Sequence, residues 1–206
     1  GGYHLLLLAR DTSGYKNLVK LVSAAYLEGF YHRPRIDFEL LQQHADGLTA
    51  TSACAQGEVA QNILAGRLDV AEEVARRYRD LFGPERYFLE IQNHGIDVEE
   101  RVRPAVVALA KKLDLGIVAT NDCHYLEKSH ARAHDALLCI QTGKMVSDTN
   151  RLRYYTDQIY FKSPDEMRTI FVDHPEACDI TLEIAARCQA KIPTGDYFYP
   201  NFPLPP

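Results

Sequence analysis

The sequence predicts an α/β fold in which parallel strands are joined by crossover helices. Short apolar runs of strand length alternate along the chain with longer segments of helical periodicity, and this alternation is typical of a parallel sheet or barrel. Each apolar run also finishes in small or polar residues. In barrels of this type the functional groups gather at the carboxyl ends of the strands.

The individual elements follow from apolar spacing and from turn residues. A seven-residue apolar run such as 3–9 (YHLLLLA) is too short for a typical helix and favours a buried strand. Residues spaced three and four apart predict helices, and Asp37 is expected to cap a short one. The expected strands are 3–9, 47–54, 87–91 and 117–120. The expected longer helices are 15–28, 57–65, 68–82, 98–113, 128–141, 164–171 and 175–188.

Composition predicts an ordinary globular protein in a reducing compartment. The 206 residues are 46% hydrophobic and 25% charged, enough for one moderate domain or slightly more. Five irregularly spaced cysteines do not form a disulfide framework, so we expect a cytoplasmic protein. The chain contains no secretory signal and no apolar run of about 18–20 residues, so no membrane role is expected.

The charge balance argues against a broad DNA-binding surface. The net charge is −5 and the pI is about 5.9, whereas domains that grip duplex DNA are usually basic. Such a chain can still handle the end of a DNA strand if metal ions supply the positive charge.

The run GIVATNDCHY places two potential ligands directly after a predicted strand. On extended backbone Asp122 and His124 would point to the same side, about 6.6 Å apart. Carboxylate and neutral imidazole together suit zinc or manganese. The alternative is that Asp122 caps the following turn and His124 makes a local hydrogen bond.

Three further residues are weaker candidates when each is taken alone. Cys54 ends the second strand and is either a thiolate ligand or a small buried apolar residue. His4 lies early in the first strand, where a core histidine is the usual finding. His94, in QNHG, is a ligand, a neighbour of a ligand or a turn residue. Four strands that each present such a residue favour a shared site.

Several catalytic classes are excluded by their motifs. His130 and His134 have the H-x-x-x-H spacing, but Ala131 stands where a zinc peptidase has glutamate. We therefore expect a solvent-facing His130 and a partly packed His134. The sequence has neither a G-x-S-x-G elbow nor a phosphate-binding Walker loop, so serine catalysis and P-loop hydrolysis are unsupported.

Several longer stretches resemble one known family. They are YHLLLLARDTSGYKNLVKLVSAAYLEGFYHRPRID, LTATSACAQGEVAQ, YFLEIQNHG, IVATNDCHYLEKSHARAHDALLCIQTGK and FKSPDEMRTIF. In this order they resemble the PHP (polymerase and histidinol phosphatase) domain of bacterial replicative DNA polymerase III alpha subunits. The resemblance implies part of a distorted (β/α)7, TIM-like barrel.

The resemblance also implies a site and an activity. It implies that His4, Cys54, Asp122 and His124 are metal ligands, with Asp122 and His124 also catalytic. The complete family site holds up to three divalent ions, here expected to be zinc or manganese, among nine ligands. The implied activity is 3′–5′ exonuclease proofreading for a DNA-directed DNA polymerase in DNA replication.

The resemblance sets expectations for boundaries and partners. Residues 1–190 are expected to be the C-terminal portion of the PHP domain, without its first strands and its N-terminal H-x-H ligands. Residues 191–206 are expected to be a proline- and aromatic-rich linker toward the polymerase region. This piece alone is expected to be inactive. The expected partners are a DNA 3′ end, the sliding clamp, the clamp loader and a separate proofreading exonuclease.

Two alternative functions remain open. One is a non-catalytic structural module that docks the polymerase and a separate exonuclease. The other is a free-standing PHP phosphoesterase, against which GFYHRPRID and FKSPDEM count because they resemble the polymerase branch.

Overall fold

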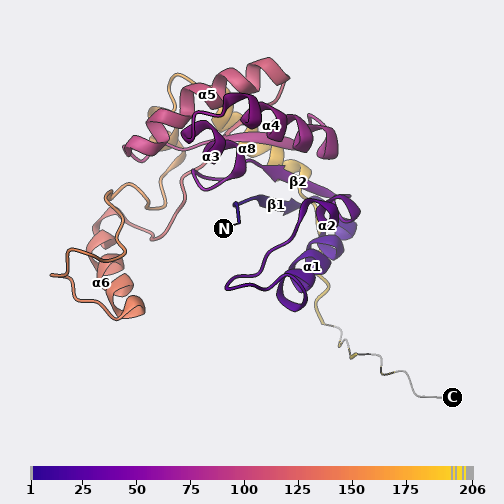
Figure 1. Ribbon diagram of the computed structural model, residues 1–206, viewed down its shortest axis with the longest axis horizontal. Helices are drawn as coiled ribbons and strands as arrows, with labels where there is room; N and C mark the ends of the chain where they lie inside the picture. Colours follow the sequence, from indigo (N-terminus) through magenta and orange to yellow (C-terminus); the bar gives the residue numbers. More distant parts are fainter. Residues whose placement is uncertain (1, 196, 198, 201, 203–206) are drawn as a thin grey trace.

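The computed structural model describes residues 2–195, 197, 199, 200 and 202, and its centre is one four-stranded sheet (Figure 1). The strands are β1 (Leu6–Ala9), β2 (Leu48–Thr51), β3 (Tyr87–Ile91) and β4 (Ile117–Ala119). They lie in the order β1-β2-β3-β4. The last three strands are parallel, as predicted, whereas β1 runs antiparallel to β2. In the described part of the chain the sheet is open, so the expected barrel is not confirmed.

The helices lie close to their predicted positions. Asp11 and Asp37 cap α1 and α2 by accepting backbone N–H groups at 2.8 Å, and Ser163 forms a capping box with Glu166 at the start of α7. The helices are α1 (Thr12–Leu27), α2 (Phe38–Gln43), α3 (Glu58–Leu64), α4 (Leu68–Phe82), α5 (Asp97–Leu113), the 3₁₀ turn η1 (Lys128–His130), α6 (Ala131–Thr142), α7 (Pro164–Ile170) and α8 (Pro175–Arg187).

The two faces of the sheet are covered by different helices. Tyr87, Leu89 and Ile91 alternate along β3 onto the face packed by α3, α4 and α5, where the main core lies. Phe88 points the other way, where it packs with Val118 and with α8. All five residues of β3 are buried, so β3 is the central support for whatever lies at its carboxyl end.

Helix α6 stands apart from these layers. In Figure 1 it lies at the lower left, joined to the sheet by the segment after β4 and by the long loop before α7. Among the described elements its extensive contacts are with η1. No helix of the described residues is long and apolar enough to cross a membrane.

The structure describes only part of the segment 191–206 that is expected to be a linker. Of the proline- and aromatic-rich segment, Tyr197, Tyr199 and Phe202 are described, and each is more than 80% exposed. Residues 196, 198, 201 and 203–206 of that segment lie outside the described residues. The linker at 191–206 therefore stays a prediction.

Candidate metal centre

Three of the four expected ligands line one pocket at the carboxyl ends of β2, β3 and β4. His4, Cys54 and Asp122 share this pocket with Glu90 and Thr120. Cys54 follows β2 and Asp122 follows β4, which the parallel pairing brings to the same edge. His4 reaches that edge because β1 is antiparallel, so its start lies beside the end of β2.

His4 and Cys54 are the closest pair of potential ligands in the pocket. Their Nδ1 and Sγ atoms are 3.5 Å apart, and the His4 N–H donates to the Gln56 carbonyl at 3.0 Å. Tetrahedral zinc, with bonds of about 2.0–2.1 Å to nitrogen and about 2.3 Å to sulfur, would separate the two donors by about 3.5 Å. His4 is exposed, so the core-histidine interpretation is wrong.

The backbone is unusual on both sides of this pocket. Ala53, just before Cys54, has φ 59°, and Asp122 has φ 34°. Residues other than glycine rarely adopt positive φ, and such conformations cluster at functional sites. The extended geometry assumed for Asp122 and His124 is therefore wrong. Asp122 Oδ1 lies 4.0 Å from His124 Nδ1, and the strand rule for side-chain direction does not apply there.

His124 does not line the pocket of the other three residues, and its ring contacts Tyr154. Its Nδ1–H donates to the Asp122 carbonyl at 2.7 Å, and its Nε2 accepts from the Tyr154 hydroxyl at 2.9 Å. The first bond fixes the tautomer, so Nε2 carries the lone pair that a metal would use. The local hydrogen bond of His124, which was one half of the alternative to metal binding, is thus observed, while the ring lone pair stays on Nε2.

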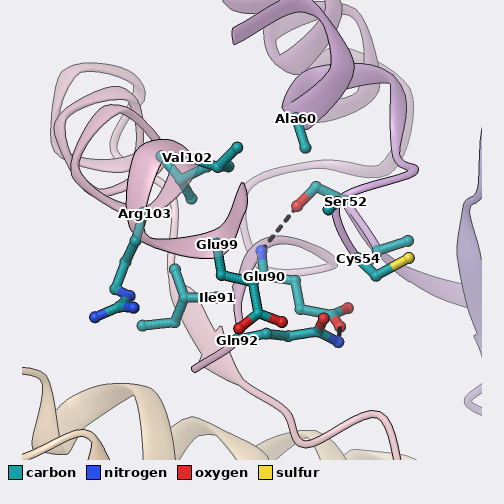
Figure 2. Close-up of a pocket in the computed structure, with 12 residues that line it drawn as sticks. Ser52, Cys54, Ala60, Glu90, Ile91, Gln92, Glu99, Val102 and Arg103 are labelled. Carbon is teal, nitrogen blue, oxygen red and sulfur yellow. Dashed lines mark hydrogen bonds between the residues drawn. The ribbon is translucent and has the colours of Figure 1, made fainter. Parts of the chain in front are cut away.

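Glu90 is a pocket residue that the sequence analysis missed. Its side chain is 8% exposed and accepts hydrogen bonds from the hydroxyls of Thr51 and Thr120 and from Gln92. Its backbone N–H donates to Ser52 Oγ at 2.8 Å, the dashed line in Figure 2. The signal was a carboxylate inside the apolar run YFLEI, where a buried charge requires a reason.

A second hollow lies on the other side of Cys54, toward α5. Figure 2 shows Cys54, Glu90 and Gln92 close together at one side of this hollow, while Arg103 points away from them. Burial raises the pKa of the Cys54 thiol, and the charges of Asp122 and Glu90 raise it further. The negative charges of Asp122 and Glu90 beside this thiol would also favour a bound cation.

His94 has a structural role in the described residues. It is 3% exposed, its Nδ1 lies 2.5 Å from Glu99 Oε1 and its Nε2–H donates to the Asn121 carbonyl at 3.0 Å. Burial lowers the His94 pKa, but the hydrogen bond and charge of Glu99 outweigh it and the pKa is raised. Both ring nitrogens have hydrogen-bond partners, so the interpretation of His94 as a metal ligand does not fit.

The remaining histidine predictions are confirmed. His130 is exposed, and His134 is partly buried with its ring 5.5 Å from that of His124. Burial and the neighbouring His124 lower the pKa of His134. In the described residues no group of three or more His, Cys, Asp and Glu side chains is spaced to hold a metal ion. The His4–Cys54 pair fits one edge of such a site, and Asp122 lines the same pocket.

Comparison with known proteins agrees with the resemblance found in the sequence. Residues 1–94 match the PHP domain family. The chain is 48% identical over 212 residues to DNA polymerase III subunit alpha of Thermus aquaticus, which covers all of the chain and 17% of that protein. The corresponding protein of Treponema pallidum is 46% identical over 203 residues, 98% of the chain and 17% of its own length. That of Mycobacterium tuberculosis is 43% identical over 210 residues.

The chain is a homologue of the PHP-containing segment of DNA polymerase III alpha subunits. The resemblance found in the sequence is thereby confirmed. Because the chain spans about a sixth of the length of these relatives, the match describes one segment of them. The residues 1–94 matched by the PHP family include His4 and Cys54, whereas Asp122 and His124 fall in the part covered by the polymerase relatives.

Proposed function

We propose that the chain acts as the PHP-domain segment of a bacterial replicative DNA polymerase, where it binds divalent metal ions and hydrolyses the 3′ end of DNA. The observation that carries the proposal is the pair His4 and Cys54, held 3.5 Å apart in the pocket that Asp122 also lines. Nitrogen, thiolate and carboxylate donors together suit zinc, and manganese is the second choice.

Each residue has a separate task in this proposal. His4, Cys54 and Asp122 supply donors from three chain segments that the sheet brings together. His124 supplies the Nε2 lone pair once the Tyr154 hydroxyl releases it. Glu90, fixed by three hydrogen bonds, keeps a negative charge behind the donors. Bound cations would neutralise phosphate charge and activate water for attack at phosphorus.

A second function is favoured by a different observation. The described residues contain no group of three metal-binding side chains that is already spaced to hold an ion. Apolar side chains are also exposed on β1 and along α1. A structural module that docks the polymerase and a separate proofreading exonuclease would need no metal chemistry. A free-standing phosphoesterase is disfavoured because the chain matches polymerase relatives along its whole length.

The deciding experiment is the substitution Asp122→Asn in the full-length protein that contains this segment. We expect less bound metal by elemental analysis and an exonuclease rate lower by about 100-fold or more, with the polymerisation rate unchanged. Asp173→Asn is the matched control, because Asp173 is an exposed carboxylate outside the pocket.

Equal nuclease rates for Asp122→Asn and the unaltered protein would remove the catalytic assignment. Metal that is absent from the purified full-length protein, before and after substitution, would leave the docking function as the better one. Bound metal by itself would not separate the two functions, because a structural metal also couples to folding.

A further inference from the structure

An arginine and a tyrosine stack on the loop that reaches from α6 back to the pocket. The Arg153 guanidinium carbon lies 5.0 Å from the centre of the Tyr155 ring, and Tyr155 is 79% exposed. Arg153 is also exposed, and it forms no ion pair with any residue that the structure describes. A free guanidinium beside an open aromatic face is a common surface for binding nucleotides.

The residue between them contacts the candidate metal centre. The Tyr154 hydroxyl donates to His124 Nε2 at 2.9 Å, and the two rings are 4.6 Å apart. Arg153 and Tyr155 are therefore one residue away from a direct contact with a proposed ligand.

The loop is fastened on both sides of the pair. Arg151, whose side chain is 2% exposed, donates to both carboxylate oxygens of Asp135 on α6 at 2.6 and 2.8 Å. On the other side the Thr156 hydroxyl donates to the His94 carbonyl at 2.8 Å. A pair held between two anchors presents its surface at little cost in conformational entropy on binding.

The charge of this region differs from that of the chain. Residues 124–163 contain six lysines and arginines against four aspartates and glutamates, a net charge of +2 in a chain of net charge −5. The six cations are Lys128, Arg132, Lys144, Arg151, Arg153 and Lys162. A segment of net positive charge in an acidic protein can attract a phosphate backbone.

We infer that Arg153 and Tyr155 form a platform for single-stranded DNA, with a base stacked on Tyr155, a phosphate at Arg153 and the strand end directed to the pocket of His4, Cys54 and Asp122. The inference rests on the proposed function for the direction of the strand, but binding itself needs no metal. Any of the four bases can stack on an aromatic ring, so such a platform suits an activity that must accept any 3′ nucleotide.

The chain offers a matched control pair. Arg35 lies over the Tyr31 ring at 5.1 Å, and Tyr31 is 66% exposed, so chemistry and exposure are similar. This second pair lies in the connection between α1 and α2, away from α6 (Figure 1). Substitutions there test whether any exposed arginine–tyrosine pair binds DNA or only the one beside His124.

The test is fluorescence anisotropy of a labelled oligothymidylate of about twelve nucleotides, titrated with the 206-residue chain in chelator at low salt. We expect Tyr155→Ala to weaken binding about tenfold, Tyr155→Phe to bind like the unaltered chain, and Tyr31→Ala to have no effect. Arg153→Gln should reduce the slope of log affinity against log salt by about 0.7, whereas Tyr155→Ala should leave that slope unchanged.

Equal affinities for the unaltered chain and Tyr155→Ala would overturn the inference, as would an equal loss in Tyr31→Ala or no binding of the oligonucleotide. The result is separable from the proposed function, because binding is measured without metal. If DNA binding depends on Tyr155 but the hydrolysis rate is the same in Asp122→Asn, the platform stands and the proposed nuclease site does not. DNA binding that does not depend on Tyr155, together with hydrolysis that is lost in Asp122→Asn, would remove only the platform.

Discussion

His94 and Glu99 form a buried pair that ties the loop after β3 to the first turn of α5. The His94 N–H also donates to Glu99 Oε2 at 2.6 Å, so one carboxylate holds both the backbone and the ring of the same histidine. Burying such groups is costly unless each is paired, and here all the ring nitrogens have partners. The loop that follows the central strand is thus fixed by side chains.

This pair predicts a pH dependence of stability. The folded-state pKa of His94 is raised above the value of about 6.5 expected in the unfolded chain. The protonated ring therefore stabilises the fold fully below about pH 6.5, and this contribution is lost as the pH rises through the raised folded pKa. Urea unfolding should show a larger loss of stability for His94→Gln at pH 6 than at pH 9.

Glu99→Gln serves as the control for the pH prediction, because it removes the carboxylate that raises the His94 pKa. The unaltered chain and this variant should differ more at pH 6 than at pH 9. A difference that does not change with pH would mean that His94 is neutral in the folded chain.

At the residue scale the sequence predicts which candidate residues come together better than it predicts how their side chains point. His4, Cys54 and Asp122 do share a pocket, and parallel strand ends explain why a sequence can predict this. The direction of the His124 side chain depends on the positive φ of Asp122. That backbone angle cannot be predicted from the residue type at position 122. Glu90 was missed because its role depends on Thr51 and Thr120, which are neighbours only across the sheet.

At the element scale the loop from β2 to α3 positions Cys54 by close backbone packing. A Cβ atom at Gly57 would lie 2.0 Å from the Ser52 carbonyl oxygen, so only glycine fits there. The close approach bends the chain between Ser52 and Gly57 and brings Gly57 against His4, with which it forms a bridge. The spacing of His4 and Cys54 therefore depends on the backbone of Gly57, whose N–H donates to the Cys54 carbonyl at 2.8 Å.

Two glycine substitutions test this packing. Gly57→Ala must displace backbone, and we expect it to cost about 2–3 kcal/mol of unfolding free energy and to weaken metal binding. Gly116→Ala meets only the side chains of Phe88 and Ile180, at 2.8 and 3.0 Å, which can move. It should cost less and leave metal binding unchanged. Urea unfolding and elemental analysis measure both, and similar metal loss in the two variants would contradict the mechanism.

Helix and strand positions were predictable because local signals agree with the fold. The caps at Asp37 and Ser163 and the unbroken apolar run of β3 each identify an element without tertiary information. The antiparallel direction of β1 was not predictable in this way, because an apolar run carries no sign of strand direction. Pairing direction is a property of contacts distant in the sequence, here those between Leu6–Ala9 and Leu48–Thr51.

At the scale of the whole molecule the chain divides into a layered part and an arm, which consists of η1, α6 and the loop between α6 and α7. The layered part has one continuous core between the sheet and α3, α4 and α5, whereas α6 carries exposed Leu137 and Ile140. Hydrogen bonds from Tyr154 to His124, from Thr156 to the His94 carbonyl and from Lys162 to Asn121 join the arm to the segments that follow β3 and β4. Motion of the arm would therefore change the pocket before it changed the core.

The arm is expected to open locally without unfolding of the layered part. Amide hydrogen exchange should be faster in α6 than in β3 and α5, because α6 buries little apolar surface. Arg151→Met removes the ion pair with Asp135 and should speed exchange in α6 and the loop after it, with the urea midpoint of the main transition unchanged. Asp179→Asn, which removes an exposed ion pair with Arg168 in the layered part, should leave exchange in the arm unaltered. Equal protection of α6 and β3 would mean that the arm and the sheet unfold as one unit, and so would a shift of the main urea transition in Arg151→Met. Motion of the arm alone could not then change the pocket.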